Sequence, residues 1–122
     1  MNASIFKAYD IRGLYPSQID EKAAYNIGRA AAEYLQAKRI AVGRDARSHS
    51  PALFASLAEG ITDAGCDVVD LGVITTPMVY FAAWRLPEAD MVISVTASHN
   101  PPEYNGMKFA LKNAVPVGEN SG

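Results

Sequence analysis

Short apolar runs alternate along this chain with segments of helical period, and this alternation restricts the possible folds more than any other feature. Five runs have the length and composition of strands: 5–14, 39–43, 66–74, 91–96 and 106–111. Three helix-like segments separate the first four runs: 20–37, 50–64 and 75–86. Strands and helices in regular succession are typical of an α/β domain. We therefore predict a mixed, mostly parallel sheet with helices on both faces.

The helix-like segments carry recognisable start and stop signals. Asp20 can cap the first segment, and the other two open with Pro51 and Pro77, each directly behind a hydroxyl residue. Gly65 can end the second segment. Gly28 lies inside the first, where it costs roughly 1 kcal/mol relative to alanine. We therefore expect another element to pack closely against Gly28.

Helical spacing of apolar residues predicts which helix faces are buried. On the first helix the expected buried residues are Ala24, Ile27, Ala31, Tyr34 and Leu35, and on the third they are Val79, Ala82, Ala83 and Leu86. We interpret Tyr80 and Trp84 of the third helix as packing residues and not as a platform for a sugar ring.

The composition excludes several classes of protein. The chain has 122 residues, of which 49% are hydrophobic and 20% charged, an ordinary balance for one globular domain. A net charge of −2 argues against a nucleic-acid-binding module. The sequence shows no signal peptide and no apolar run long enough to span a bilayer, so we expect no membrane partner. The single Cys66 fits a reducing, cytoplasmic location.

Polar residues follow three of the predicted strands, where ligands gather in parallel sheets. These residues are Arg12, Arg44 and Ser98. A guanidinium at position 12 could clamp phosphate in a bidentate manner or form a surface ion pair with a carboxylate. We expect Arg44 to form a structural ion pair with Asp45, and His49 to be a solvated turn residue.

The loop at 96–108, with the sequence TASHNPPEYNGMK, follows the most apolar of the strand-like runs. Ser98 offers a nucleophilic oxygen, and His99, Asn100 and Lys108 surround it with nitrogen-bearing side chains. Such donors suit a negatively charged group on the serine. Ser-His-Asn before Pro-Pro is also good turn chemistry, so the functional interpretation depends on the whole string and not on Ser98 alone.

Three segments of the chain resemble the α-D-phosphohexomutase family, in its phosphomannomutase/phosphoglucomutase branch. They are KAYDIRG at 7–13, VGRD at 42–45 and the 96–108 loop, in the family's order and approximate spacing. The resemblance implies that residues 1–122 form a single domain like the N-terminal, phosphoserine-bearing domain of a four-domain enzyme. The other domains of the same enzyme would be its partners, and the chain would be truncated.

The resemblance also implies a reaction. Ser98 would carry a phosphoryl group and give it to a hexose monophosphate, forming a hexose 1,6-bisphosphate, and then take back the phosphoryl group from the other position. Hexose 6-phosphate and hexose 1-phosphate would thereby interconvert. The sequence leaves the choice between mannose and glucose open, and this chain by itself is expected to be inactive.

Roles for individual residues follow from the same resemblance. Lys108 would neutralise the transferred group and take part in proton transfer, and Arg12 would hold the phosphate from the other side. His99 and Asn100 would shape the loop and donate hydrogen bonds. Tyr9 would contact the sugar or its phosphate.

A magnesium ion is expected as cofactor, with hexose 1,6-bisphosphate as activator. In the family, the phosphate oxygen on the serine holds Mg²⁺ together with an Asp-rich loop of the second domain. This sequence contains no Asp-x-Asp-x-Asp run, so only the phosphate on Ser98 would serve as a ligand here. The remaining ligands are expected outside this chain.

A second class of function stays open for the 122-residue chain. Without a metal loop or an evident sugar-reading segment, it could act as a non-catalytic module that binds phosphosugars or a protein partner. A serine hydrolase is excluded, because the sequence lacks a glycine-flanked nucleophile elbow and an obvious acid partner.

Overall fold

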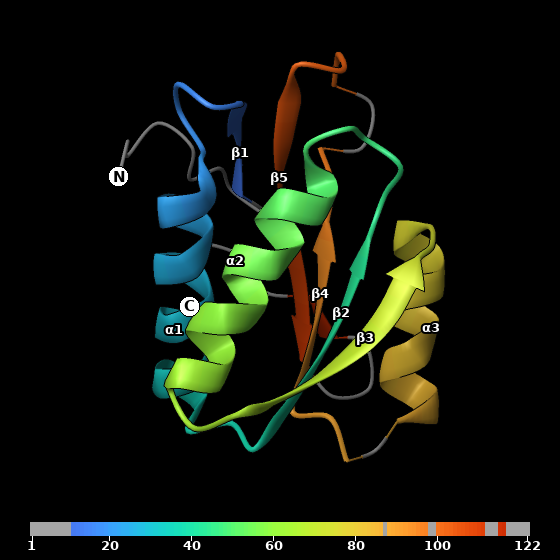
Figure 1. Ribbon diagram of the computed structural model, residues 1–122. Helices are drawn as coiled ribbons and strands as arrows, with labels where there is room; N and C mark the ends of the chain where they lie inside the picture. Colours follow the sequence, from blue (N-terminus) through green and yellow to red (C-terminus); the bar gives the residue numbers. More distant parts are fainter. Residues whose placement is uncertain (1–10, 87, 98–99, 112–114, 117–122) are drawn as a thin grey trace.

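The computed structural model describes residues 11–86, 88–97, 100–111 and 115–116, and they form alternating strands and helices (Figure 1). In chain order the elements are β1 (Ile11–Leu14), α1 (Glu21–Leu35), β2 (Arg39–Arg44), α2 (Ser50–Asp63), β3 (Asp67–Val73), α3 (Thr76–Arg85), β4 (Met91–Val95), β5 (Tyr104–Leu111) and β6 (Val115–Pro116). The order matches the prediction, except that the short β6 was not anticipated. Of the predicted first strand, residues 5–10 lie outside the described residues.

The strands form one mixed sheet in the order β1-β5-β4-β2-β3, with β6 also paired to β5. β2 runs parallel to both β3 and β4. β5 runs antiparallel to β4, and β1 and β6 run antiparallel to β5. The predicted α/β class with a mixed sheet is confirmed, but the expectation of a mostly parallel sheet is wrong, because three of the five strand pairings are antiparallel. β5 follows β4 after a short loop, so the chain turns back and pairs antiparallel, and β1 adds to β5 in the same sense.

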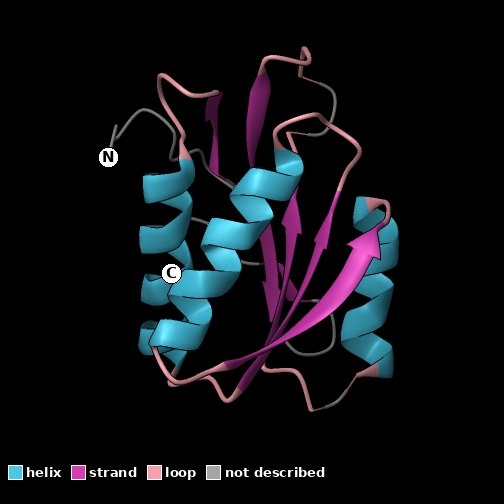
Figure 2. Cartoon of the chain, viewed as in Figure 1, coloured by secondary structure: helices cyan, strands magenta, loops and turns pink. Residues whose placement is uncertain are grey.

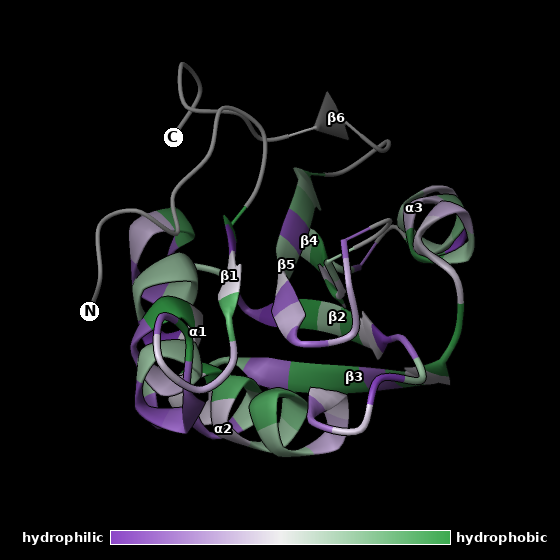
Figure 3. Cartoon of the chain, turned by 90° about the horizontal axis from the view of Figure 1, so that it is seen from above, coloured by the Kyte–Doolittle hydropathy of each residue, from purple (hydrophilic) through white to green (hydrophobic). Residues whose placement is uncertain are grey.

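Helices cover both faces of the sheet. α1 and α2 lie side by side on one face, and α3 covers the other face, against β4, β2 and β5 (Figure 2). The view from above shows the strands between these two layers (Figure 3). No helix in the described part of the chain combines the length and the hydropathy needed to cross a bilayer.

The alternation of side chains along each strand divides the core into two clusters. On β4, Met91, Ile93 and Val95 belong to the larger cluster beneath α1 and α2. Val92 belongs to the smaller cluster beneath α3. Because both faces of β4 are covered, this strand is a continuous apolar run broken only by Ser94.

Two glycines allow α1 and α2 to pack closely. A Cβ atom added at Gly28 would lie 2.2 Å from the carbonyl oxygen of Leu57, and one at Gly60 would lie 2.0 Å from that of Tyr25. Any larger side chain at either position would push the helices apart. The expected close contact at Gly28 is confirmed.

Two of the predicted helix starts are confirmed and one is displaced. Asp20 and Thr75 are the N-caps of α1 and α3, and each side-chain oxygen accepts a backbone hydrogen bond from the first turn. In α2 the N-cap position is His49, and Ser50 is already helical. The Ser50 hydroxyl does not cap the helix, because it donates to the carboxylate of Asp45.

The burial predictions are wrong for two aromatic residues. The other residues expected on the buried faces are either buried (Ala24, Ile27, Val79 and Ala83) or half-buried (Ala31, Leu35, Ala82 and Leu86). Tyr34 is 72% exposed and Trp84 is 63% exposed. Tyr34 lies in the last turn of α1, one residue before its end at Leu35. Trp84 follows the buried Ala83 and projects from the outer side of α3. Tyr80 is half-buried against the smaller cluster, as predicted.

Candidate functional site

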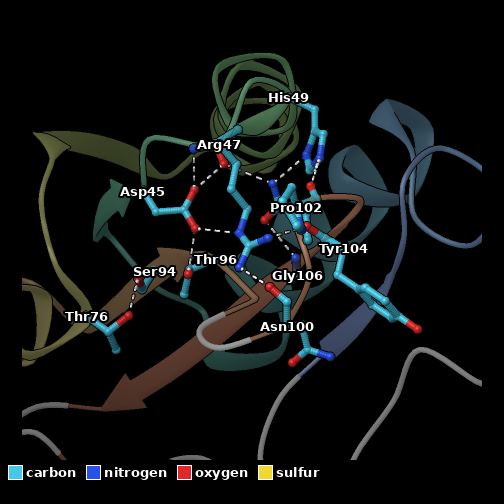
Figure 4. Close-up of polar contacts among 12 residues, drawn as sticks. Asp45, Arg47, His49, Thr76, Ser94, Thr96, Asn100, Pro102, Tyr104 and Gly106 are labelled. Carbon is cyan, nitrogen blue, oxygen red and sulfur yellow. Dashed lines mark hydrogen bonds and ion pairs between the residues drawn. The ribbon is translucent and has the colours of Figure 1, made fainter.

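Polar residues meet at the carboxyl ends of β2 and β4. Asp45 follows β2, and its backbone N–H donates to the carbonyl oxygen of Val95 at 3.1 Å. Thr96 follows β4, and its N–H donates to the carbonyl oxygen of Gly106 at 2.9 Å. These backbone bonds bring the ends of β2, β4 and β5 to one edge of the sheet, which Figure 4 shows in close-up.

Asp45 is the centre of this network. One carboxylate oxygen accepts from the Ser50 hydroxyl at 2.5 Å and from the backbone N–H of Arg47 at 3.0 Å. The other accepts from the Thr96 hydroxyl at 2.7 Å and from Nε of Arg47 at 3.0 Å. Both oxygens of this half-buried carboxylate are therefore satisfied, by donors from the loop after β2, from the first residue of α2 and from the residue after β4.

The surroundings of Asp45 favour its charged form. Burial alone would raise the pKa of this carboxyl, but the hydrogen bonds from Ser50, Thr96 and Arg47 outweigh burial and lower the pKa below its usual value. Asp45 is thus an anion at neutral pH and orients the guanidinium of Arg47.

Arg47 connects this network to the loop after β4. Its Nη1 donates to the carbonyl oxygen of Pro101 at 2.7 Å and to that of Tyr104 at 3.3 Å. Its Nη2 donates to the carbonyl oxygen of Asn100 at 2.9 Å. A planar guanidinium with five N–H donors suits such a set of carbonyl oxygens better than a lysine would. Arg47 therefore fixes the backbone of the turn at 100–104.

His49 holds the same turn from α2. Its Nε2 lies 3.0 Å from the carbonyl oxygen of Pro102, and its Nδ1 lies 2.8 Å from Nδ2 of Asn105. Because a carbonyl oxygen can only accept, Nε2 must donate, so Nδ1 accepts from the Asn105 amide when the ring is neutral. The ring also stacks on Tyr15, with centroids 4.5 Å apart. The expectation of a solvated turn histidine is wrong.

Asn105 is fully buried and joins the two halves of the network. Its Oδ1 accepts from the backbone N–H of Gly106, which assigns Nδ2 to the side that faces His49 and Ser50. Nδ2 also donates to Ser50 Oγ at 2.9 Å. The Asn105 amide thus donates to the Ser50 hydroxyl, and the Ser50 hydroxyl in turn donates to the Asp45 carboxylate, so each group has one consistent role.

The expected pair between Arg44 and Asp45 does not form. Arg44 lies 2.9 Å from Asp70 on β3, and its guanidinium lies over the ring of Phe54. Asp45 pairs instead with Arg47, two residues further along. Arg44 and Asp45 are neighbours at the end of a strand, where successive side chains point to opposite faces.

The structure brings two of the predicted site residues into contact. Nη1 of Arg12, on β1, donates to Oδ1 of Asn100 at 3.0 Å. The register of the sheet places Arg12 opposite Gly106, which lies two residues before Lys108 on β5. Side chains two residues apart share a face, so Arg12 and Lys108 lie on the same face of the sheet, about 7 Å apart along β5.

Gly106 is required for this arrangement. A Cβ atom added there would lie 1.8 Å from the carbonyl oxygen of Ile11. Only glycine allows β1 to approach β5 this closely, and β1 carries Arg12. On the other edge of β5, Lys108 is paired with the buried Ser94 of β4. The hydroxyl of Ser94 lies 3.2 Å from that of Thr76.

The remaining predicted site residues, Tyr9, Ser98 and His99, lie outside the described residues. The described positions nearest to Ser98 are Ala97, which is fully buried, and Asn100. Sequence reasoning missed Asp45, Arg47, His49, Thr96 and Asn105 as parts of the site. Signals were present for four of them: Asp45 and Arg47 follow the VGR end of a predicted strand, and Thr96 and Asn105 lie within the 96–108 loop string.

The described residues do not provide a metal site. They contain no group of three His, Cys, Asp or Glu side chains that could hold an ion. The carboxylate at this edge, Asp45, already directs both oxygens at hydrogen-bond donors. The donor set of the described part of the chain does not fit Mg²⁺ without ligands from elsewhere.

Comparison with known proteins gives the same picture over nearly the whole chain. Residues 3–121 match the family model described as phosphoglucomutase/phosphomannomutase, alpha/beta/alpha domain I. A phosphomannomutase of Klebsiella pneumoniae is 49% identical over 117 residues, covering 96% of this chain and 74% of that protein. A phosphoglucomutase of Neisseria gonorrhoeae is 47% identical over 118 residues, covering 94% of this chain and 25% of that protein.

A solved structure agrees in fold. A phosphoglucomutase/phosphomannomutase family protein of Burkholderia thailandensis superposes with a TM-score of 0.87 at 43% identity, covering 96% of this chain and 28% of that one. The chain thus spans about a quarter of the length of two of these three proteins. Because the family model matches almost every residue, the chain belongs to the phosphoglucomutase/phosphomannomutase family, and it corresponds to domain I of that family.

Proposed function

We propose that this chain is the phosphoserine-bearing domain of a mutase that interconverts hexose 6-phosphate and hexose 1-phosphate. Membership of the family supports the proposal. The observation that carries it is the bond between Arg12 and Asn100. It brings a cation from β1, 88 residues away in sequence, to a loop residue two positions after Ser98.

In the first step the phosphorylated Ser98 gives its phosphoryl group to a hydroxyl of a hexose monophosphate. The bond between phosphorus and the serine oxygen breaks, and a bond between phosphorus and the sugar oxygen forms. The proton lost by the sugar hydroxyl passes to the serine oxygen, with Lys108 taking part in the transfer, and the products are a hexose 1,6-bisphosphate and the free Ser98 hydroxyl. Return of the phosphoryl group from the other position to Ser98 regenerates the phosphoserine and releases the isomeric monophosphate.

Such a transfer needs positioning and charge neutralisation above all. A phosphoserine carries about −1.5 to −2 charges. Arg12 and Lys108 supply two cations on one face of the sheet, and Lys108 also takes part in proton transfer. Asn100, held by Arg12, and His99 donate hydrogen bonds at the loop, and Tyr9 contacts the sugar or its phosphate.

Magnesium would be held by the phosphate on Ser98 and by carboxylates from outside this chain, and it would neutralise part of the phosphate charge. The described residues offer no metal site of their own. The groups that read the sugar also lie in the rest of the protein. The proposed reaction therefore allows either a mannose or a glucose phosphate as substrate. The relatives include both a phosphomannomutase and a phosphoglucomutase.

The test is the mass of the full-length protein after incubation with a hexose 1,6-bisphosphate and Mg²⁺. We expect an increase of one phosphoryl group that maps to Ser98 and is absent from Ser98→Ala. Subsequent addition of hexose 6-phosphate should release hexose 1-phosphate. A protein that binds hexose phosphates but is never phosphorylated at Ser98 would support the non-catalytic binding module instead.

A further inference from the structure

We propose that Arg47, oriented by Asp45, is a positioning residue that holds both flanks of Ser98. This inference rests on the proposed function, because it assigns Arg47 a task in phosphoryl transfer from Ser98. Arg47 contacts the loop through backbone atoms and has no substrate-binding task in the proposed reaction. Its effect on the reaction would therefore pass through the shape of the loop.

The ion pair reaches the loop from both ends. Before Ser98, the carboxylate of Asp45 accepts from the Thr96 hydroxyl at 2.7 Å. After Ser98, Nη2 of Arg47 donates to the carbonyl oxygen of Asn100 at 2.9 Å. Thr96 and Asn100 each lie two residues from Ser98, so a single ion pair fixes the backbone on either side of the serine (Figure 4).

The guanidinium fits this task in geometry and in charge. Its side chain is only 13% exposed. Its N–H groups point toward the Asp45 carboxylate and toward the carbonyl oxygens of Asn100, Pro101 and Tyr104. Three carbonyl oxygens directed at one place repel each other unless a cation lies between them. A lysine carries the same charge but cannot reproduce the planar fork of donors.

Arg47 and Arg12 act on the same turn in different ways. Arg12 binds the side chain of Asn100, whereas Arg47 binds its carbonyl oxygen. Arg12 lies on the face that also carries Lys108, and we assign it to the phosphate. Arg47 reaches the turn from the side of Asp45 and Ser50, and we assign it to holding the backbone of the turn.

The experiment compares Arg47→Lys with Arg44→Lys in the full-length protein. Arg44 is a matched control, because it lies three residues before Arg47 at the end of β2, is 20% exposed and also pairs with a carboxylate, Asp70. We expect Arg47→Lys to lower kcat roughly 10- to 100-fold, as small misplacements of reacting groups do. The KM for hexose phosphate should stay within about twofold, since substrate binding is not assigned to Arg47. Arg44→Lys should leave both constants near the wild-type values.

A second variant keeps the proposal testable if Arg47→Lys does not fold. Thr96→Val conserves the side-chain volume but removes the hydrogen bond that the Thr96 hydroxyl, two residues before Ser98, donates to Asp45. It should also lower kcat with little change in KM, and its effect should be less than additive with Arg47→Lys if the two act as one unit. An unchanged kcat in both variants, or a raised KM at unchanged kcat, would overturn the proposal. If the wild-type protein is never phosphorylated at Ser98, the proposed function itself fails, whatever the kinetics of the variants.

Discussion

Replacing Asp45 by asparagine tests whether this carboxylate organises the edge of the sheet. The carboxylate accepts hydrogen bonds from Ser50, Thr96 and both the backbone and the side chain of Arg47. An amide of the same shape keeps one accepting oxygen but turns an NH₂ group toward donors. A hydrogen bond to a charged group contributes about 1.5–3 kcal/mol. Loss of one to two such bonds should lower the free energy of unfolding at pH 7 by about 1.5–6 kcal/mol.

The lowered pKa of Asp45 also predicts how the stability difference between wild type and Asp45→Asn changes with pH. Because the pKa of Asp45 is lowered in the folded state, its charge stabilises the fold above the unfolded-state value, for which the ordinary reference is 3.8. That contribution disappears as the pH falls from this reference value through the folded-state pKa. Asp45→Asn lacks the titrating group, so the difference in stability between wild type and variant should shrink as the pH is lowered from 7 toward 3.

Urea unfolding of the 122-residue chain at a series of pH values measures both effects. Asp67→Asn is the control, since Asp67 is 79% exposed and lies 3.9 Å from Arg39. Its effect should stay within about 0.5 kcal/mol. If Asp45→Asn is as stable as the wild type at pH 7, or if its deficit is the same at pH 7 and pH 3, the carboxylate does not have the role assigned to it.

Three further substitutions test the geometry. Gly106→Ala should move β1 away from β5, because the new Cβ would lie 1.8 Å from the Ile11 carbonyl oxygen. We expect it to cost about 1–3 kcal/mol in urea unfolding and to reduce mutase activity, whereas activity equal to wild type would contradict the placement of Arg12. Gly28→Ala should destabilise by a similar 1–3 kcal/mol despite alanine's higher helix propensity, and a gain in stability would show that α1 and α2 are not in close contact. Arg12→Lys should lose the bond to Asn100 and lower kcat/KM roughly 10- to 150-fold, the equivalent of about 1.5–3 kcal/mol. A change smaller than twofold in steady-state kinetics would remove Arg12 from the site.

The existence and order of the helices and the five longer strands could be predicted from local patterns. Period and caps depend on neighbouring residues, as the Asp20 and Thr75 caps show. The tight contact at Gly28 could also be predicted, because glycine destabilises a helix interior and is usually found there where another element packs closely. Tyr34 and Trp84 were assigned to the core by the same patterns, but the width of each packed face depends on neighbours that the local sequence does not reveal.

The contacts that join the loop after β2 to the loop after β4 could not be predicted, because they connect residues far apart in sequence, whereas the contacts of Asp45 with Arg47 and Ser50 are local. His49 and Asn105 are separated by 56 positions, and Asp45 and Thr96 by 51. Only the sheet order, with β4 beside β2 and β5 beside β4, brings them to one edge. The same topology gives Arg44 a distant partner, Asp70, in place of its neighbour Asp45.

A single-turnover experiment tests the central claim most directly. Full-length protein labelled with phosphate at Ser98 would be mixed with unlabelled hexose 6-phosphate, and the label would be followed on protein and sugar. The account predicts that label leaves Ser98 and appears in hexose 1,6-bisphosphate at least as fast as the enzyme turns over. Label that stays on the protein while hexose 1-phosphate accumulates would contradict it.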